Sequence, residues 1–76
     1  MKLANVRMGR FYRIVAIGGN DMERRRLLDM GFTPERKIFT AHSAPFGGTI
    51  LIRLGGFSVA LRSDAAALIE VDEAKA

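Results

Sequence analysis

The chain has 76 residues, with 12 Lys and Arg against 8 Asp and Glu and no cysteine. Below roughly 100 residues a chain builds only one hydrophobic core, so we expect a single domain over residues 1–76. The lack of cysteine excludes disulfides, thiolate metal sites and a cysteine nucleophile. A net charge of +4 is compatible with nucleic acid, an anionic membrane or an acidic protein as partner and does not choose among them.

The sequence predicts a cytoplasmic chain. Its longest apolar run, residues 65–69, is far shorter than the roughly 20 residues that span a bilayer. Arg7, Arg10 and Arg13 interrupt the apolar stretch that a signal peptide would need after Lys2. We therefore expect neither a membrane span nor a cleaved leader.

Local signals mark a first strand and the start of a helix. Residues 11–17 are rich in β-branched and aromatic side chains and are followed by two glycines, which indicates a strand. Asn20 and Glu23 have the spacing of a capping box and predict a helix over residues 21–30.

The end of this helix is also marked. Gly31 followed by Phe32 is typical of a Schellman ending, in which the residue after the glycine packs back on the helix. A ten-residue helix is marginally stable alone, so we expect it to dock on the rest of the domain through Leu27, Leu28 and Met30.

The middle of the chain predicts three strands. Residues 37–42 alternate weakly between polar and apolar and indicate a second strand. Residues 49–54 and 57–62 are β-rich runs joined only by Gly55-Gly56, the two-residue loop favoured in tight hairpins. Alternation then predicts a core of six side chains: Ile50, Ile52, Leu54, Phe57, Val59 and Leu61.

The C-terminal part completes a mainly β fold. Ser63 or Asp64 is expected to cap one helical turn over residues 65–68, before a short strand over 69–71 and a polar, frayed tail over 72–76. Five short strands in so small a domain favour a strongly bent antiparallel sheet that closes into a small barrel. One α-helix would cover an open end of this barrel.

No catalytic constellation is present, so we expect no enzyme and no small-molecule substrate. His42 and Ser43 are consecutive strand residues that point to opposite faces, which makes a nucleophile–base pair geometrically poor. His42 is better interpreted as a surface residue at a strand end. The carboxylates of the helix lie among arginines, where solvated ion pairs account for them.

No cofactor and no dedicated metal site are expected either. The spacings of His, Asp and Glu match no metal-binding motif, and weak divalent-metal binding at His42 or Asp72 would be adventitious. A nucleic-acid partner is not expected, because base stacking needs exposed aromatic rings. The sequence assigns four phenylalanines to the core instead: Phe11, Phe32, Phe39 and Phe57.

Two surface features leave a choice open. Arg24, Arg25 and Arg26 fan around the helix, where they are either partly neutralised by aspartates one turn away or available to an acidic partner. Phe46, in the turn over residues 44–48, is either folded back as a lid or offered to a partner.

Three segments carry a resemblance to a known family. They are RRLLDMGFTP at residues 25–34, APFGG at residues 44–48, and VALR at residues 59–62 followed by Ala66 and by Ile69-Glu70-Val71. In order and spacing they closely resemble the FeoA family, over nearly the whole chain from Arg24 to Val71. Two departures are local: Glu35 stands where the family often has glycine, and Gly48-Thr49 replaces a common Asp-Pro.

The resemblance implies an SH3-like small β-barrel and a small cytosolic component of bacterial ferrous iron transport. The implied partner is FeoB, the membrane transporter with a cytosolic GTP-binding domain. FeoA-like domains also occur at the C-terminus of DtxR-type metal-dependent repressors, so the fold alone does not fix the role. Exposed strand edges would also permit self-association.

We therefore expect a non-enzymatic module that docks on FeoB and regulates ferrous iron uptake. Its candidate contact residues lie on the helix and in the turn: Arg24, Arg25, Leu28, Met30, Pro45, Phe46 and Gly47. The alternatives are a regulatory domain that binds a divalent transition metal, as in DtxR-type repressors, and a small nucleic-acid-binding barrel.

Overall fold

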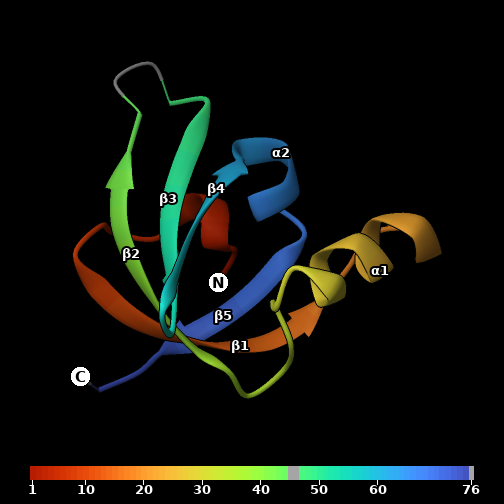
Figure 1. Ribbon diagram of the computed structural model, residues 1–76, viewed down its shortest axis with the longest axis horizontal. Helices are drawn as coiled ribbons and strands as arrows, with labels where there is room; N and C mark the ends of the chain where they lie inside the picture. Colours follow the sequence, from red (N-terminus) through yellow and green to blue (C-terminus); the bar gives the residue numbers. More distant parts are fainter. Residues whose placement is uncertain (45–46, 76) are drawn as a thin grey trace.

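The computed structural model describes residues 1–44 and 47–75 and contains one strongly curved, five-stranded antiparallel sheet (Figure 1). Along the chain the elements are the 3₁₀ helix η1 (Leu3–Asn5), β1 (Arg10–Ile17), α1 (Asp21–Asp29), β2 (Lys37–Ser43), β3 (Thr49–Leu54), β4 (Phe57–Arg62), α2 (Ser63–Ala66) and β5 (Ile69–Glu73). The strands are ordered β4-β3-β2-β1-β5 in the sheet. This confirms the mainly β fold and the order of elements predicted from the sequence.

The sheet is strongly bent, but its two edge strands do not pair with each other. Register shifts between Ile14 and Ala16 and between Thr40 and His42 mark irregularities of the kind that bend strands. The two edge strands, β4 and β5, are connected by α2, which follows the end of β4 in Figure 1. The barrel is therefore small and open on this side.

The two sheet edges differ in how they are covered. The N-terminal ammonium donates to the Val71 carbonyl at 3.0 Å, and the Val71 N–H donates to the Met1 carbonyl at 2.7 Å. The first residues therefore pair with the outer edge of β5. Along β4, by contrast, no other described segment hydrogen-bonds to the outer edge of the strand.

The core lies on the inner face of the sheet and is completed by η1, α1 and α2. Its buried apolar residues are Leu3, Tyr12, Ile14, Leu27, Phe32, Ile38, Ile50, Ile52, Leu54, Leu61, Ala66, Ile69 and Val71. Thr40 is the buried polar residue among them. Its hydroxyl donates to the Arg7 carbonyl at 2.8 Å and accepts from the Arg10 N–H at 3.3 Å, which holds the segment before β1 against β2.

The predicted hairpin core is confirmed in part. Four of its six residues are buried, and Val59 is half-buried. Phe57, however, is 73% exposed, so the prediction for this residue was wrong. It pairs with Leu54 at the first position of edge strand β4, where no further strand covers it.

Two further phenylalanines also lie outside the core. Alternation along β1 turns Tyr12 and Ile14 inward, which places Phe11 on the outer face of the sheet. Phe39 is directly opposite Phe11 on β2 and lies on the same outer face. Of the four phenylalanines assigned to the core, only Phe32 is buried there.

The C-terminal elements begin and end at other residues than predicted. Helix α2 starts at Ser63, and its N-cap is Arg62, which makes no side-chain capping hydrogen bond. The prediction that Ser63 or Asp64 caps this turn was wrong. Strand β5 continues through Asp72 and Glu73, where a frayed tail was expected, because both residues pair with β1. In the described part of the chain, no helix has the length and apolarity to cross a bilayer.

Candidate functional site

Helix α1 carries three of the predicted contact residues, Arg24, Arg25 and Leu28, and a fourth, Met30, is its C-cap; both ends of the helix are fixed by local hydrogen bonds. The Asn20 side chain accepts from the Glu23 N–H at 2.8 Å, and the Glu23 carboxylate accepts from the Asn20 N–H at 2.9 Å. This is the predicted capping box. At the other end, the Phe32 N–H donates to Leu27 and the Gly31 N–H to Leu28, each at 3.0 Å, which is the predicted Schellman pattern.

Fewer side chains of α1 are buried against the rest of the domain than predicted. Leu27 is buried, with 3% of its surface exposed, and Phe32 is buried beyond the helix end. Leu28 is only half-buried and Met30 is 38% exposed, so the prediction that all three residues anchor the helix was wrong. Leu28 and Met30 are consequently available for contact with a partner.

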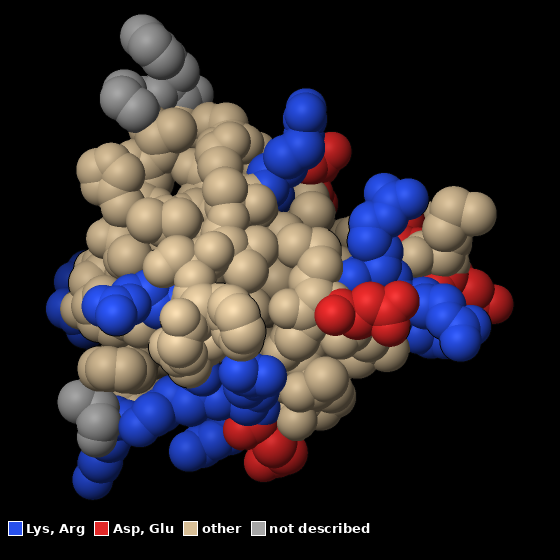
Figure 2. All heavy atoms as spheres, in the orientation of Figure 1, with Lys and Arg blue, Asp and Glu red and all other residues tan. Residues whose placement is uncertain are grey.

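The arginines of α1 are only partly neutralised. Arg24 forms an ion pair with Asp21 at 3.1 Å. Arg25 and Arg26 are exposed, and neither forms an ion pair with any described residue. Figure 2 shows the mixed charges gathered on the projecting α1, beside a broad uncharged area over the sheet.

A groove runs between α1 and the β4–α2 connection, with a volume of about 310 Å³. Its lining residues are Glu23, Arg26, Leu27, Met30, Ala60, Leu61, Arg62, Asp64, Ala65 and Leu68. The lining is thus largely apolar and also includes two acidic and two basic side chains. We name it the α1–α2 groove. Leu27 and Met30, three residues apart on one helix face, are a sequence signal for the α1 wall, whereas no local pattern indicates the wall formed by β4 and α2.

The predicted contact residues fall on different surfaces. Met30 lines the α1–α2 groove, whereas Arg24, Arg25 and Leu28 line a separate hollow on α1 with Asp21 and Asp29.

In the β2–β3 turn, Pro45 and Phe46 lie outside the described residues. Gly47 is exposed and lines neither hollow; its N–H donates to the Ala44 carbonyl at 2.9 Å. The next residue, Gly48, accepts from the Ser63 N–H at 3.1 Å, which places the end of this turn beside α2. The structure therefore does not combine all the predicted residues into one site.

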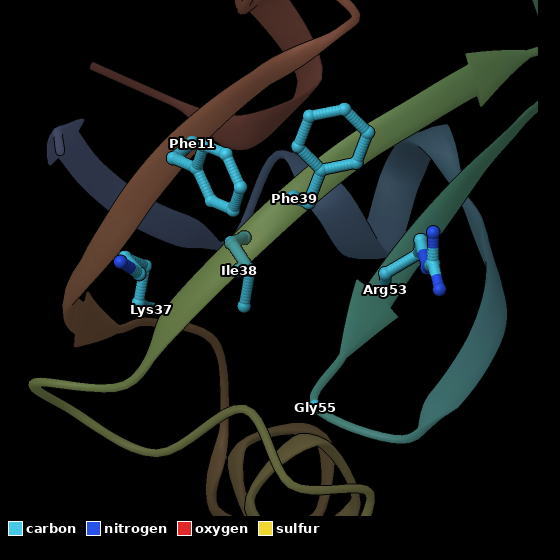
Figure 3. A pocket seen from close by; sticks show the side chains of 6 residues that line it. All are labelled: Phe11, Lys37, Ile38, Phe39, Arg53 and Gly55. Carbon is cyan, nitrogen blue, oxygen red and sulfur yellow. The ribbon is translucent and has the colours of Figure 1, made fainter. Parts of the chain in front are cut away.

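A second hollow, of about 340 Å³, lies on the outer face of the sheet (Figure 3). It is lined by Phe11, Lys37, Ile38, Phe39, Arg53 and Gly55. The rings of Phe11 and Phe39 are 4.9 Å apart between centroids and tilted by 55°. This hollow was missed because both rings were assigned to the core.

The remaining polar groups form no catalytic or metal centre in the described part of the chain. His42 and Ser43 are both exposed near the end of β2, in agreement with a surface position for His42. No group of three or more His, Cys, Asp or Glu side chains is arranged to hold a metal ion among the described residues.

The Glu70 carboxyl has a shifted pKa. The N-terminal ammonium lies 2.8 Å from the Glu70 carboxylate and the Lys2 ammonium 3.4 Å from it. Hydrogen bonds from these two cations, the N-terminal one first, lower the pKa of Glu70 below its usual value of 4.5. These pairs fasten the first residues to β5, far in sequence from α1.

The fold and its surfaces define a class of protein: a small SH3-like barrel that presents grooves and charged patches. Residues 1–73 match the model of the FeoA domain, and the chain therefore belongs to the FeoA family. FeoA is a non-catalytic accessory domain of ferrous iron transport.

Individual relatives agree with this assignment. The chain is 33% identical over 72 residues to a fusion of Fe(2+) transport protein A with the Fe(2+) transporter FeoB from Porphyromonas gingivalis. This match covers 95% of the chain but only 8% of the fusion protein.

Solved structures agree as well. An FeoA-like protein from Clostridium acetobutylicum has a TM-score of 0.89 at 30% identity, with 96% of this chain and 85% of that chain covered. The zinc complex of Stenotrophomonas maltophilia FeoA, described as an SH3 domain protein, has a TM-score of 0.81 at 26% identity, with 95% and 89% covered.

Proposed function

We propose that this chain acts in the cytoplasm, where it docks on the cytosolic part of a FeoB-type ferrous iron transporter and regulates uptake. The observation that carries the proposal is the Porphyromonas gingivalis relative, in which the matching segment and FeoB are one polypeptide. Fusion holds two partners at high effective concentration, which supports an interaction between the separate counterparts.

The α1–α2 groove is the docking surface that we assign to this function. Leu27, Leu61 and Leu68 offer an apolar floor, and Met30 offers a half-exposed, adaptable side chain at its side. A protein interface of this kind combines an apolar centre with a polar rim. The expected occupant is an apolar side chain on a FeoB segment, flanked by charges that match the rim.

An NMR titration tests the proposal. Isotope-labelled protein is titrated with the purified cytosolic domain of the cognate FeoB, with and without a GTP analogue. We expect shift changes that cluster on α1, the end of β4 and α2. Absence of shifts at saturating concentrations in both nucleotide states would contradict docking on this domain.

Two methionines of α1 provide a matched pair of variants. Met30 lines the groove, whereas Met22 is 71% exposed on the same helix and lines neither of the α1 hollows. Met30→Gln should weaken FeoB binding by about 5-fold, which corresponds to the loss of about 1 kcal/mol of apolar contact at the side of the groove. Met22→Gln should leave binding unchanged, and equal effects of the two variants would exclude the groove as the docking surface.

Regulation by a directly bound divalent metal is the second candidate, and the zinc complex of the Stenotrophomonas maltophilia relative is the observation that favours it. Anaerobic calorimetric titration with Fe²⁺ separates the two functions. Under the docking proposal we expect affinity no better than millimolar, while tighter, stoichiometric binding would support the metal-responsive function.

A further inference from the structure

The outer face of the sheet carries an aromatic pair in a cationic surround. Phe11 and Phe39 come from adjacent strands, and Phe39 is paired in turn with Arg53 on β3. Figure 3 shows the two rings next to each other, with Lys37 to one side and Arg53 to the other. The Lys37 ammonium lies 5.1 Å from the centroid of the Phe11 ring. The rings and cations together line the hollow of about 340 Å³.

The strands that form the hollow carry only basic charges, whereas the neighbouring strand β5 places Asp72 opposite Arg13 on the same face. Strands β1, β2 and β3 contain Arg10, Arg13, Lys37 and Arg53 and no Asp or Glu. Lys37 donates to the Lys75 carbonyl at 3.1 Å, and neither it nor Arg53 forms an ion pair with any described residue. Two cations beside two aromatic rings, with no compensating acid on their strands, match a ligand that combines flat rings with repeated negative charges.

We propose that this face binds single-stranded nucleic acid, with a base stacked in the hollow against Phe39 and Phe11 and with phosphates held by Lys37 and Arg53. Nonspecific binders of single strands combine these two elements, an aromatic platform and a positively charged track. From the sequence we expected no nucleic-acid partner, because Phe11 and Phe39 were assigned to the core. In the structure both rings line the hollow on the outer face, so the reason for this exclusion no longer holds.

The half-buried state of the rings favours this ligand over a lipid surface. Insertion into a membrane uses apolar side chains that protrude, whereas Phe11 and Phe39 pack against each other on the sheet. The hollow shares no residue with the α1–α2 groove, so this proposal does not depend on docking to FeoB.

Fluorescence anisotropy of the full chain with labelled single strands of about ten uridines or thymidines tests the proposal. We expect a Kd between about 1 and 100 µM, the range of nonspecific binding. Between about 50 and 200 mM salt, two phosphate contacts should give a log–log slope of about −1.4, at about 0.7 per contact. A duplex of the same length should bind at least about 5-fold more weakly, because its bases are not free to stack on the rings.

Matched variants locate the contact. Phe39→Leu keeps an apolar side chain but removes the ring face, and it should weaken binding by about 5-fold or more. Phe57→Leu makes the same change at an exposed ring that does not line the hollow, and it should have no effect. Arg53→Gln should reduce the salt slope by about 0.7, while Arg25→Gln on α1 should leave the slope unchanged.

Three results would overturn the proposal. The first is no binding at low salt, and the second is equal affinity for duplex and single strand. The third is equal loss with Phe39→Leu and Phe57→Leu in chains that circular dichroism shows to be folded. Binding to phosphatidylglycerol vesicles through Phe39 and Arg53, without binding to the oligonucleotides, would assign the face to a membrane instead.

Discussion

Glu35 occupies a backbone conformation that favours glycine, and its replacement by glycine should stabilise the protein. Its φ is +76°, in the left-handed region. Hydrogen bonds fix the backbone around it: the Glu35 N–H donates to the Ile14 carbonyl at 2.8 Å, and the Ile14 N–H donates to the Arg36 carbonyl at 3.0 Å. The Glu35 side chain is exposed and makes no hydrogen bond or ion pair with a described residue.

Two opposing contributions set the change in the free energy of unfolding that we expect for Glu35→Gly. The left-handed conformation costs a residue other than glycine about 1–2 kcal/mol, and Glu35→Gly removes this cost. Glycine adds about 0.5–1 kcal/mol of unfolded-state entropy that folding must overcome. We expect a net gain of about 0.5–1 kcal/mol, which raises the melting temperature of a domain of this size by about 2–8 °C.

Urea unfolding followed by circular dichroism measures this difference. Glu35→Ala is the control, because it removes the carboxylate but keeps the Cβ and the strain; its stability should stay close to that of the parent chain. Gly31→Ala tests the opposite sign. Gly31 has φ +107° and an added Cβ would meet only ordinary contacts, so the strain of about 1–2 kcal/mol is offset by about 0.5–1 kcal/mol of unfolded-state entropy and we expect a net loss of about 0.5–1 kcal/mol.

The reasoning would be refuted if Glu35→Gly were no more stable than Glu35→Ala. This outcome would mean that the left-handed conformation of the loop carries no strain that glycine relieves.

Three other changes test the hydrogen bonds and charges described above. Asn20→Ala should lower the free energy of unfolding by about 1 kcal/mol, because α1 loses its N-cap; an unchanged urea midpoint would contradict this. Thr40→Val should cost about 1–3 kcal/mol by leaving the Arg7 carbonyl without its buried donor, and a near-neutral melting curve would show that solvent replaces the hydroxyl. The lowered pKa of Glu70 makes its ionised form more favourable in the folded chain, so its contribution is present above pH 4.5 and is lost as the pH falls through the lowered pKa. Melting temperatures of the parent and of Glu70→Gln should therefore differ at pH 7 and converge towards pH 3, whereas a constant difference would argue against this pair.

Features that depend on a few neighbouring residues could be predicted from the sequence. The capping box at Asn20, the glycine-ended helix and the Gly55-Gly56 hairpin each rest on residues within one turn of chain. Helix α2 was displaced by two residues, because Arg62 provides its N-cap without a side-chain hydrogen bond and the sequence has no signal for such a start.

The position of the phenylalanines could not be predicted from alternation alone. Alternation groups side chains by face, but it does not state which face is covered or where a strand extends beyond the core. Phe57 shares a face with Leu61, which is buried, but Phe57 itself is exposed at the first position of β4, next to the hairpin turn at the end of the ladder. Phe11 alternates with the polar-tipped Tyr12, and here Tyr12 is the buried one, with its hydroxyl accepting from the Arg7 N–H at 3.2 Å.

The same limit applies to the candidate site. The family motifs drew attention to α1 and to the turn at Pro45 and Phe46. The α1–α2 groove, however, needs Ala65 and Leu68, which come from the far end of the chain. Such a surface is created by tertiary packing, and it has no signature within any one segment.

The unequal covering of the sheet edges limits how copies of the chain can assemble. Growth of a fibre by strand addition needs two open edges on each molecule, one to accept the previous copy and one to offer to the next. Here Met1 already pairs with the middle of β5 at Val71, while the outer edge of β4 has no partner among the described segments. Pairing of strands between copies through β4 would therefore stop at two, and the first residues of the chain protect it against open-ended aggregation.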